Sequence, residues 1–136
     1  MAAELLFTII CDDIRVENTG KLIVIGLYNG TINFAKAAAP EGQGGEPKYA
    51  LPHLCFLRRW RLDSDKATVK MELVEPSGNI RKYPEVELQK QDDYDYAQEI
   101  MRTVGVVLSP GKYTIVVSVV GPNPRKYEDT FWVREV

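Results

Sequence analysis

The amino-acid sequence predicts an all-β fold: a single-domain β-sandwich of about eight or nine mostly antiparallel strands, immunoglobulin-like or C2-like in general shape. Apolar and polar residues alternate with a period of two in several segments, and these segments are rich in β-branched and aromatic residues. Clusters of Gly, Asn and Pro separate the segments at short intervals, which is typical of sandwiches and barrels. The 136 residues suffice for one domain with a substantial core.

The predicted strands follow one another closely and occupy residues 4–13, 20–28, 31–35, 53–62, 67–75, 80–88, 96–108, 112–120 and 127–135. The first strand presents one apolar face, formed by Leu5, Phe7, Ile9 and Cys11. Two later strands alternate clearly and place on their inner faces Ala67, Val69, Met71 and Leu73, and Tyr113, Ile115, Val117 and Val119. In the last strand, Phe131 and Val133 share a face and Trp132 lies on the other.

The residues between the strands favour turns and one long loop. Glu17-Asn18-Thr19-Gly20 tolerates positive φ between the first two strands, and Asn29-Gly30 is preferred in a tight hairpin between the second and third. Residues 35–50 read AKAAAPEGQGGEPKYA and contain almost no large apolar side chain. Such a composition does not offset the entropy cost of ordering, so we expect a long mobile loop.

The charge balance and the first residues exclude several classes of protein. The formal charge is −2, from 17 basic and 19 acidic residues, whereas domains that bind nucleic acid through its phosphates are usually basic. The start MAAELLFTIICDD lacks the basic residues of a signal peptide and is too short to span a membrane. Two cysteines are too few for the disulfide framework of a secreted domain. We therefore expect a soluble cytoplasmic protein without nucleic-acid or membrane partners.

No residue pattern indicates catalysis, and we expect that the protein is not an enzyme. The motifs G-x-S-x-G, GxGxxG and GxxxxGK[ST] do not occur in the sequence. Cys11 precedes two carboxylates, which raise a thiol pKa, so we interpret it as a small core residue. His53, the only histidine, lies at a predicted strand entrance and has no CxxC or HxxxH partner for zinc. A hydrolase would require Asp12 or Asp13 to meet His53 or an arginine.

An acidic cluster offers an alternative as a calcium-binding or small-ligand-binding sandwich. The segment QDDYDY contains Asp92, Asp93 and Asp95, and carboxylates at Asp12 and Asp13 would complete a calcium site if the two regions converge. The DxDxDG spacing of a calcium loop does not occur, and acidic loops are usually only solvated. We therefore expect no metal ion and no other cofactor.

The run Arg58-Arg59-Trp60-Arg61 combines basic and aromatic side chains, as single-stranded nucleic-acid sites do. In a strand, however, Arg59 and Arg61 share one face, and Arg58 lies on the other face with Trp60. We interpret the segment as a core strand whose outer arginines pair with carboxylates of a neighbouring strand. A contact with a protein or an anion is the second interpretation.

Four segments together resemble a family of small uncharacterised bacterial proteins that share an all-β domain of unknown function. They are C-D-D-I-R from Cys11, G-K-L-I-V-I-G-L-Y-N-G from Gly20, L-P-H-L-C-F from Leu51, and P-G-K-Y-T-I from Pro110. The resemblance implies a bacterial or phage source and an all-β fold, and it implies no activity, ligand or catalytic residue. Among the matching positions, turns account for Gly20 and Gly30, whereas Asp12, Asp13 and Arg15 suggest a buried ion-pair corner or hydrogen bonds to the backbone of the Glu17–Gly20 turn.

These observations favour a non-catalytic binding or adaptor domain that contacts another protein. We expect the contact surfaces to include the 35–50 loop and the outer arginines Arg59 and Arg61, because loops on rigid scaffolds often carry recognition. Trp132 extends this set, since its predicted position is opposite the core-facing side of its strand. A homodimer formed through an edge strand or through the Trp132 face is a further expectation.

Overall fold

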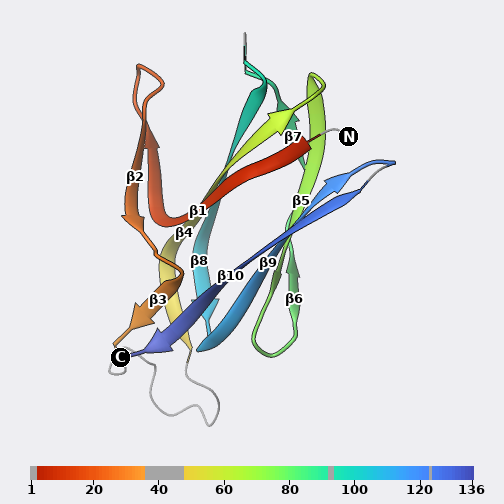
Figure 1. Ribbon diagram of the computed structural model, residues 1–136. Helices are drawn as coiled ribbons and strands as arrows, with labels where there is room; N and C mark the ends of the chain where they lie inside the picture. The colour runs from red at the N-terminus through yellow and green to blue at the C-terminus, as the bar shows by residue number, and fades with distance from the viewer. Residues whose placement is uncertain (1–2, 36–47, 92–93, 123) are drawn as a thin grey trace.

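The computed structural model describes residues 3–35, 48–91, 94–122 and 124–136 and confirms the all-β fold (Figure 1). Ten strands form two sheets that pack as a β-sandwich: β1 (Ala3–Val16), β2 (Leu22–Leu27), β3 (Thr31–Phe34), β4 (Tyr49–Leu62), β5 (Lys66–Val74), β6 (Ile80–Lys82), β7 (Val86–Gln89), β8 (Tyr96–Leu108), β9 (Gly111–Val120) and β10 (Arg125–Glu135). Within these residues, no helix is long and apolar enough to cross a membrane.

The two sheets differ in size and in strand direction. Sheet A has the strand order β2-β1-β4-β8, and sheet B has the order β3-β10-β9-β5-β6, with β7 also paired to β5. Every pair among the described strands is antiparallel except β3 with β10, which is parallel. The predicted, mostly antiparallel arrangement is therefore confirmed.

The main core lies between the two sheets and consists of the side chains that alternate inward. The two strands with the clearest sequence alternation, now β5 and β9, bury all eight predicted side chains. Phe131 and Val133 of β10 are also buried, whereas Trp132 between them is 42% exposed. From sheet A, the inner face contributes apolar side chains that include Leu54, Phe56, Trp60 and Leu62.

The start of β4 differs from the prediction. β4 begins at Tyr49, so the last two residues of the predicted 35–50 loop belong to a strand, and its residues 36–47 lie outside the described residues. The Tyr49 ring stacks on Phe34 with 4.6 Å between centroids, and its hydroxyl donates a 2.6 Å hydrogen bond to Glu135. These contacts with β3 and β10 bury Tyr49 and extend the strand toward its N-terminal end.

Two predicted connections are also wrong. Asn29-Gly30 does not close a hairpin, because β2 pairs with β1 in sheet A whereas β3 pairs with β10 in sheet B. The segment carries the chain from one sheet to the other, and the Gly30 carbonyl accepts a 2.9 Å bond from the N–H of Trp132. The predicted strand 80–88 is two strands, β6 and β7, which pair with different parts of β5. Pro84, between them, has no N–H to donate to a ladder.

A bulge in β1 changes which side chains face the main core. The register between β1 and β4 shifts between Leu5 and Phe7. Leu5 packs against the main core, whereas Phe7, Ile9 and Cys11 lie on the outer face of sheet A. The predicted common face of these four residues is therefore wrong at Leu5, because one inserted residue reverses the alternation of the side chains that follow it, here up to Cys11.

Candidate ligand-binding site

The outer face of sheet A carries a second, smaller core. β1 changes partner at Cys11: earlier residues pair with β4, and later residues pair with β2 to form a hairpin (Figure 1). The buried side chains of this core are Cys11, Ile14, Cys55 and Leu57, and the partly buried Ile9, Leu22 and Ile100 pack against them. The β1–β2 hairpin is thus held against the outer side of β4 and β8, where the Arg102 guanidinium also donates a hydrogen bond to the Ile14 carbonyl.

The Asp12-Asp13-Arg15 corner has a structural role in this hairpin. The Tyr28 hydroxyl donates a hydrogen bond to the Asp12 carboxylate, which lies so close to Gly26 that a Cβ there would overlap it. These side-chain contacts of Asp12 join β1 to the end of β2 rather than to the Glu17–Gly20 turn. Asp13 and Arg15 form an ion pair at 3.7 Å, with side chains 39% and 71% exposed, so the prediction of a buried ion pair is wrong and the pair lies at the surface.

The two cysteines are poor nucleophiles in this setting. Burial, followed by the charges of Cys55, Asp12 and Asp13, raises the pKa of Cys11 to about 11. Burial also raises the pKa of Cys55 above its ordinary value. Both side chains are fully buried, so the interpretation of Cys11 as a small core residue is confirmed.

The residues considered for the alternative calcium site and the alternative hydrolase site do not assemble in the described part of the chain. His53 lies inside β4, opposite Val104, rather than at a strand entrance, and it is exposed. Residues 92 and 93, predicted as calcium ligands, lie outside the described residues, and Asp95 lies 3.6 Å from Arg61 in an ion pair. Among the described residues, no group of three His, Cys, Asp or Glu side chains could hold a metal ion.

An open pocket of about 440 Å³ lies where the tip of the hairpin meets the outer face of sheet A. Val16, Gly20 and Leu22 form the hairpin side of the pocket, and the sheet side is formed by Arg59, Gln91, Tyr96, Gln98 and Ile100. We call this the Arg59 pocket. Its volume is within the range of small-ligand sites, and its lining combines apolar walls with a few polar groups, as such sites do.

Arg59 is the charged side chain among these lining residues. Its guanidinium carbon lies 4.3 Å from the ring centroid of Tyr96 and 5.8 Å from that of Phe7, from the strands on either side of β4. Its Nε is buried without a hydrogen-bond partner, and no ion pair joins Arg59 to a carboxylate of the described residues. A buried, unsatisfied donor costs roughly 1–3 kcal/mol, so an arrangement of this kind calls for an explanation.

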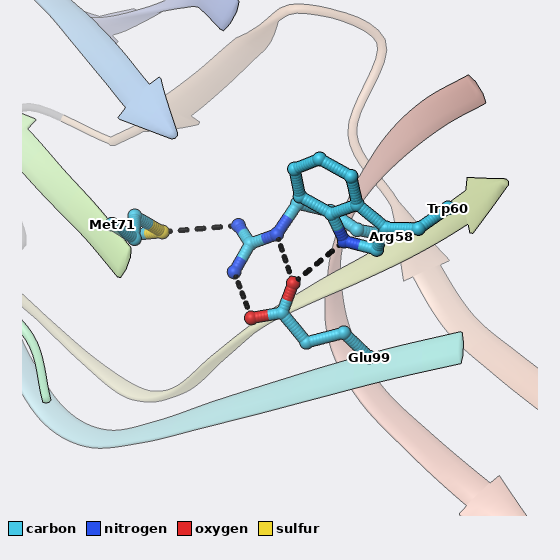
Figure 2. A network of polar contacts seen from close by, with 4 residues as sticks. All are labelled: Arg58, Trp60, Met71 and Glu99. Carbon is cyan, nitrogen blue, oxygen red and sulfur yellow. Dashed lines mark hydrogen bonds and ion pairs between the residues drawn. The ribbon is translucent and has the colours of Figure 1, made fainter. Parts of the chain in front are cut away.

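The neighbouring arginines of β4 are both neutralised. On the inner face, Arg58 Nε and Nη2 each donate a 2.7 Å hydrogen bond to Glu99 of β8, in a buried bidentate pair (Figure 2). Trp60 Nε1 donates to the same carboxylate at 3.1 Å, and Arg58 Nη1 lies 3.1 Å from the sulfur of Met71. On the outer face, Arg61 lies 3.4 Å from Glu4 in an ion pair, in addition to its pair with Asp95. Arg59 therefore differs from both in lacking an anionic partner among the residues that the structure describes.

The Arg58–Glu99 pair was not predicted, although Arg58 carried a signal as a charged residue on the apolar face of its strand. In the strand of Glu99, apolar residues occur on both faces, so alternation does not show that Glu99 is buried. Alternation alone gives the face of Arg58, but the partner depends on the register between β4 and β8, which lie far apart in the sequence.

The three predicted contact residues do not form one surface. Arg59 and Arg61 lie on the outer face of sheet A, whereas Trp132 lies on β10, on the outer side of sheet B. The Arg134 guanidinium lies 5.8 Å from the centroid of the Trp132 ring. Arg59 is the member of this set that lines a pocket.

Comparison with known proteins adds a distant structural likeness. No model of a protein family matches the sequence, and no curated protein matches it. Among solved structures, the β-glucuronidase of Bifidobacterium dentium in complex with coumarin-3-O-glucuronide matches with a TM-score of 0.49 and 12% sequence identity. The match covers 97% of this chain and 18% of that one. The chain thus spans less than one fifth of that enzyme's chain, and a likeness this distant says nothing about activity.

Proposed function

We propose that the protein is a non-catalytic binding domain that contacts another protein through the Arg59 pocket. The observation that carries the proposal is the guanidinium of Arg59, which lines an open pocket and has no carboxylate partner within the described chain. Most buried donors in native proteins have a hydrogen-bond partner, and a ligand in the pocket would supply one for Arg59. Arg59 belongs to the residues that the sequence predicted as a contact, so two lines of reasoning meet at one side chain.

The state of the other candidate groups supports a non-catalytic role. The raised pKa of Cys11, about 11, keeps its thiol protonated near neutral pH, and the Asp12 carboxylate is bonded to Tyr28. A nucleophile or general base needs a pKa near the working pH and an accessible position. These groups serve the packing of the hairpin instead.

We further propose that the protein belongs to the small bacterial family that the sequence resembles and, as expected from its sequence, that it is cytoplasmic. Asp12, Gly26 and Tyr28 are three of the matching positions, and they form one set of contacts between β1 and β2. A shared pattern at these positions would therefore preserve the hairpin that forms one wall of the Arg59 pocket.

Self-association through β2 is a second candidate function. β2 is the edge strand of sheet A, and its Ile23, Val24, Ile25 and Leu27 are 36–64% exposed. An apolar strand with an unpaired edge is a template for pairing with a second strand. Sedimentation of the native chain and of Ile25→Lys tests this candidate: a dimer that dissociates in the variant supports it, and a monomer in both rules it out.

Affinity capture tests the binding proposal. The intact chain, Arg59→Ala and Lys70→Ala are used as baits in lysate of the source cell. Lys70 is the matched control, because it is an exposed cation on the outer face of sheet B. We expect a protein that the intact chain and Lys70→Ala retain and that Arg59→Ala loses. Retention that is equal in all three would contradict a role for the Arg59 pocket.

A further inference from the structure

We propose that the Arg59 pocket binds the carboxylate of an acidic side chain on the partner polypeptide. This inference rests on the proposed function and adds the chemical class of the ligand. Three properties of the pocket carry it: the single charge among its described lining residues, the orientation of the Arg59 guanidinium, and the apolar side chains at its wall.

The charge of the pocket matches a monoanion. Of its described lining residues, Arg59 is the charged one, and Gln91 and Gln98 add neutral amides that donate and accept hydrogen bonds. A phosphate carries more charge and is usually held by several cations or by a nest of backbone N–H groups. One guanidinium with two amides is therefore better suited to a carboxylate.

The aromatic rings beside Arg59 leave the edge of the guanidinium as the route to a ligand, while Nε itself is buried in the pocket wall. Tyr96 and Phe7 lie against the guanidinium with their rings, and the N–H groups of arginine all point outward in its own plane. A carboxylate is planar and accepts two parallel N–H bonds from such an edge. The neighbouring Arg58 makes this bidentate arrangement with Glu99 inside the core.

The apolar wall favours an acid with an aliphatic stem. Val16 and Leu22 from the hairpin and Ile100 from β8 line the same pocket as Arg59. The methylene groups of a glutamate side chain would pack against them while the carboxylate reaches the guanidinium. The volume of about 440 Å³ accommodates such a side chain with part of its backbone.

Nuclear magnetic resonance of the ¹⁵N-labelled full-length chain provides a direct test, because each arginine Nε–H gives its own signal. The probes are N-acetyl-Ala-Ala-Glu-Ala-Ala-amide, the same peptide with Gln in place of Glu, glutarate, and inorganic phosphate. The Arg59 signal is assigned by its loss in Arg59→Lys. The Arg58 signal is an internal reference, since that Nε already donates to Glu99.

We expect the Glu peptide to shift the Arg59 signal saturably, with a dissociation constant on the order of 1 mM for so short a ligand, and to leave the Arg58 signal in place. The Gln peptide should bind at least about tenfold more weakly, because it lacks the charge-assisted bonds. Arg59→Lys should lose a similar factor, because an ammonium has no planar fork. Arg61→Lys is the matched control and should bind as the native chain does, since Arg61 already has Glu4 and Asp95.

Three results would overturn the inference. Equal binding of the Glu and Gln peptides would show that the pocket does not recognise a carboxylate. Tighter binding of phosphate would show that the preferred ligand is another anion. Glutarate that binds at least as tightly as the Glu peptide would point to a small acid instead of a polypeptide. If Arg59→Ala loses a captured partner while the Glu peptide does not bind, the ligand class is wrong and the binding function stands. If neither is observed, both proposals are wrong.

Discussion

The two faces of sheet A use consecutive arginines in opposite ways. Arg58 faces the main core, is fully buried, and gives its donors to Glu99 and to the sulfur of Met71. Arg59 faces outward, lines a pocket, and has an unpartnered Nε. The two residues are chemically identical and adjacent in the chain, so the difference arises from the face of the strand on which each one lies. Inside the core a charge needs an internal partner, whereas at a pocket the partner can come from another molecule.

The Arg58–Glu99 pair adds little to the net free energy of unfolding, but removal of one partner alone is strongly destabilising. Removing two charges from water costs several kcal/mol per ion, which mutual attraction and hydrogen bonds only offset. Arg58 donates to both oxygens of Glu99, and Trp60 adds a second donor to Oε1. Loss of Arg58 or Glu99 therefore leaves the other charge buried without a counter-charge. Loss of Arg59 leaves no charge unpaired among the described residues.

The largest expected effect comes from breaking the inner pair. Glu99→Ala should lower the free energy of unfolding by about 3–5 kcal/mol, because Arg58 then stays buried without a counter-charge. The double variant Arg58→Met with Glu99→Leu should recover most of this loss. Urea unfolding measures all three chains, and Glu4→Ala, which breaks an exposed pair with Arg61, should cost less than about 1 kcal/mol. A Glu99→Ala cost as small as that of Glu4→Ala would remove the contrast between the faces.

The next effect concerns the hairpin that forms the outer wall. Gly26→Ala should cost at least about 2 kcal/mol, because φ is +68° and the new Cβ would overlap the Asp12 carboxylate. Gly20→Ala is the matched control: its φ is +83°, but nothing lies within 4 Å of the new Cβ, so only the backbone strain of about 1 kcal/mol applies. Thermal unfolding compares the two variants. Equal costs would show that the Asp12 contact does not constrain the hairpin.

The pH dependence of the free energy of unfolding tests whether water is excluded from the outer core around Cys11, as it is from the core between the sheets. Between pH 9, the ordinary pKa of the thiol, and about 11, its value in the folded chain, Cys11 ionises in the unfolded state and stays protonated in the folded state. The folded state then binds more protons, so its stability falls as the pH rises through this window, by about 2 kcal/mol in total. Urea unfolding at several pH values should give a shallower decline for Cys11→Ala. Parallel curves for the two chains would mean that water reaches this core.

The smallest effect on stability, with a large effect on binding, is expected at Arg59. Arg59→Met should change the free energy of unfolding by at most about 1 kcal/mol, because the lost contact with Tyr96 is offset by removal of an unsatisfied donor. The same variant should lose the captured partner. Unfolding in urea and affinity capture, carried out on one preparation, measure both properties. A decrease in the free energy of unfolding above about 2 kcal/mol would mean that Arg59 stabilises the fold as Arg58 does, and the two arginines would not differ in role.

The sequence predicted the features that depend on alternation within a strand. It placed Arg58 on the core face and Arg59 and Arg61 on the other, and it identified the buried faces of β5, β9 and β10 correctly. Alternation is local, because successive side chains point to opposite faces whatever the strand pairs with. The expected pairing of outer arginines with carboxylates holds for Arg61 and fails for Arg59.

Features that depend on distant partners could not be predicted in this way. The bulge after Leu5, the partner change at Cys11, and the placement of β3 in sheet B all follow from contacts with strands remote in the sequence. Asn29-Gly30 illustrates the limit, since its residues suit a hairpin but its neighbours pair elsewhere. The Arg59 pocket exists because the hairpin folds back over sheet A, and no local pattern encodes that fold.

The small outer core gives the molecule two levels of cooperativity. Only four side chains are buried beneath the β1–β2 hairpin, compared with the extensive core between the sheets, so the hairpin can detach by local unfolding while the sandwich stays folded. Amide hydrogens of β2 would then exchange with solvent faster than those of β9. Because Val16, Gly20 and Leu22 are pocket walls, detachment also dismantles the site. A ligand at Arg59 would slow this exchange, and its measured affinity would include the free energy of keeping the hairpin closed.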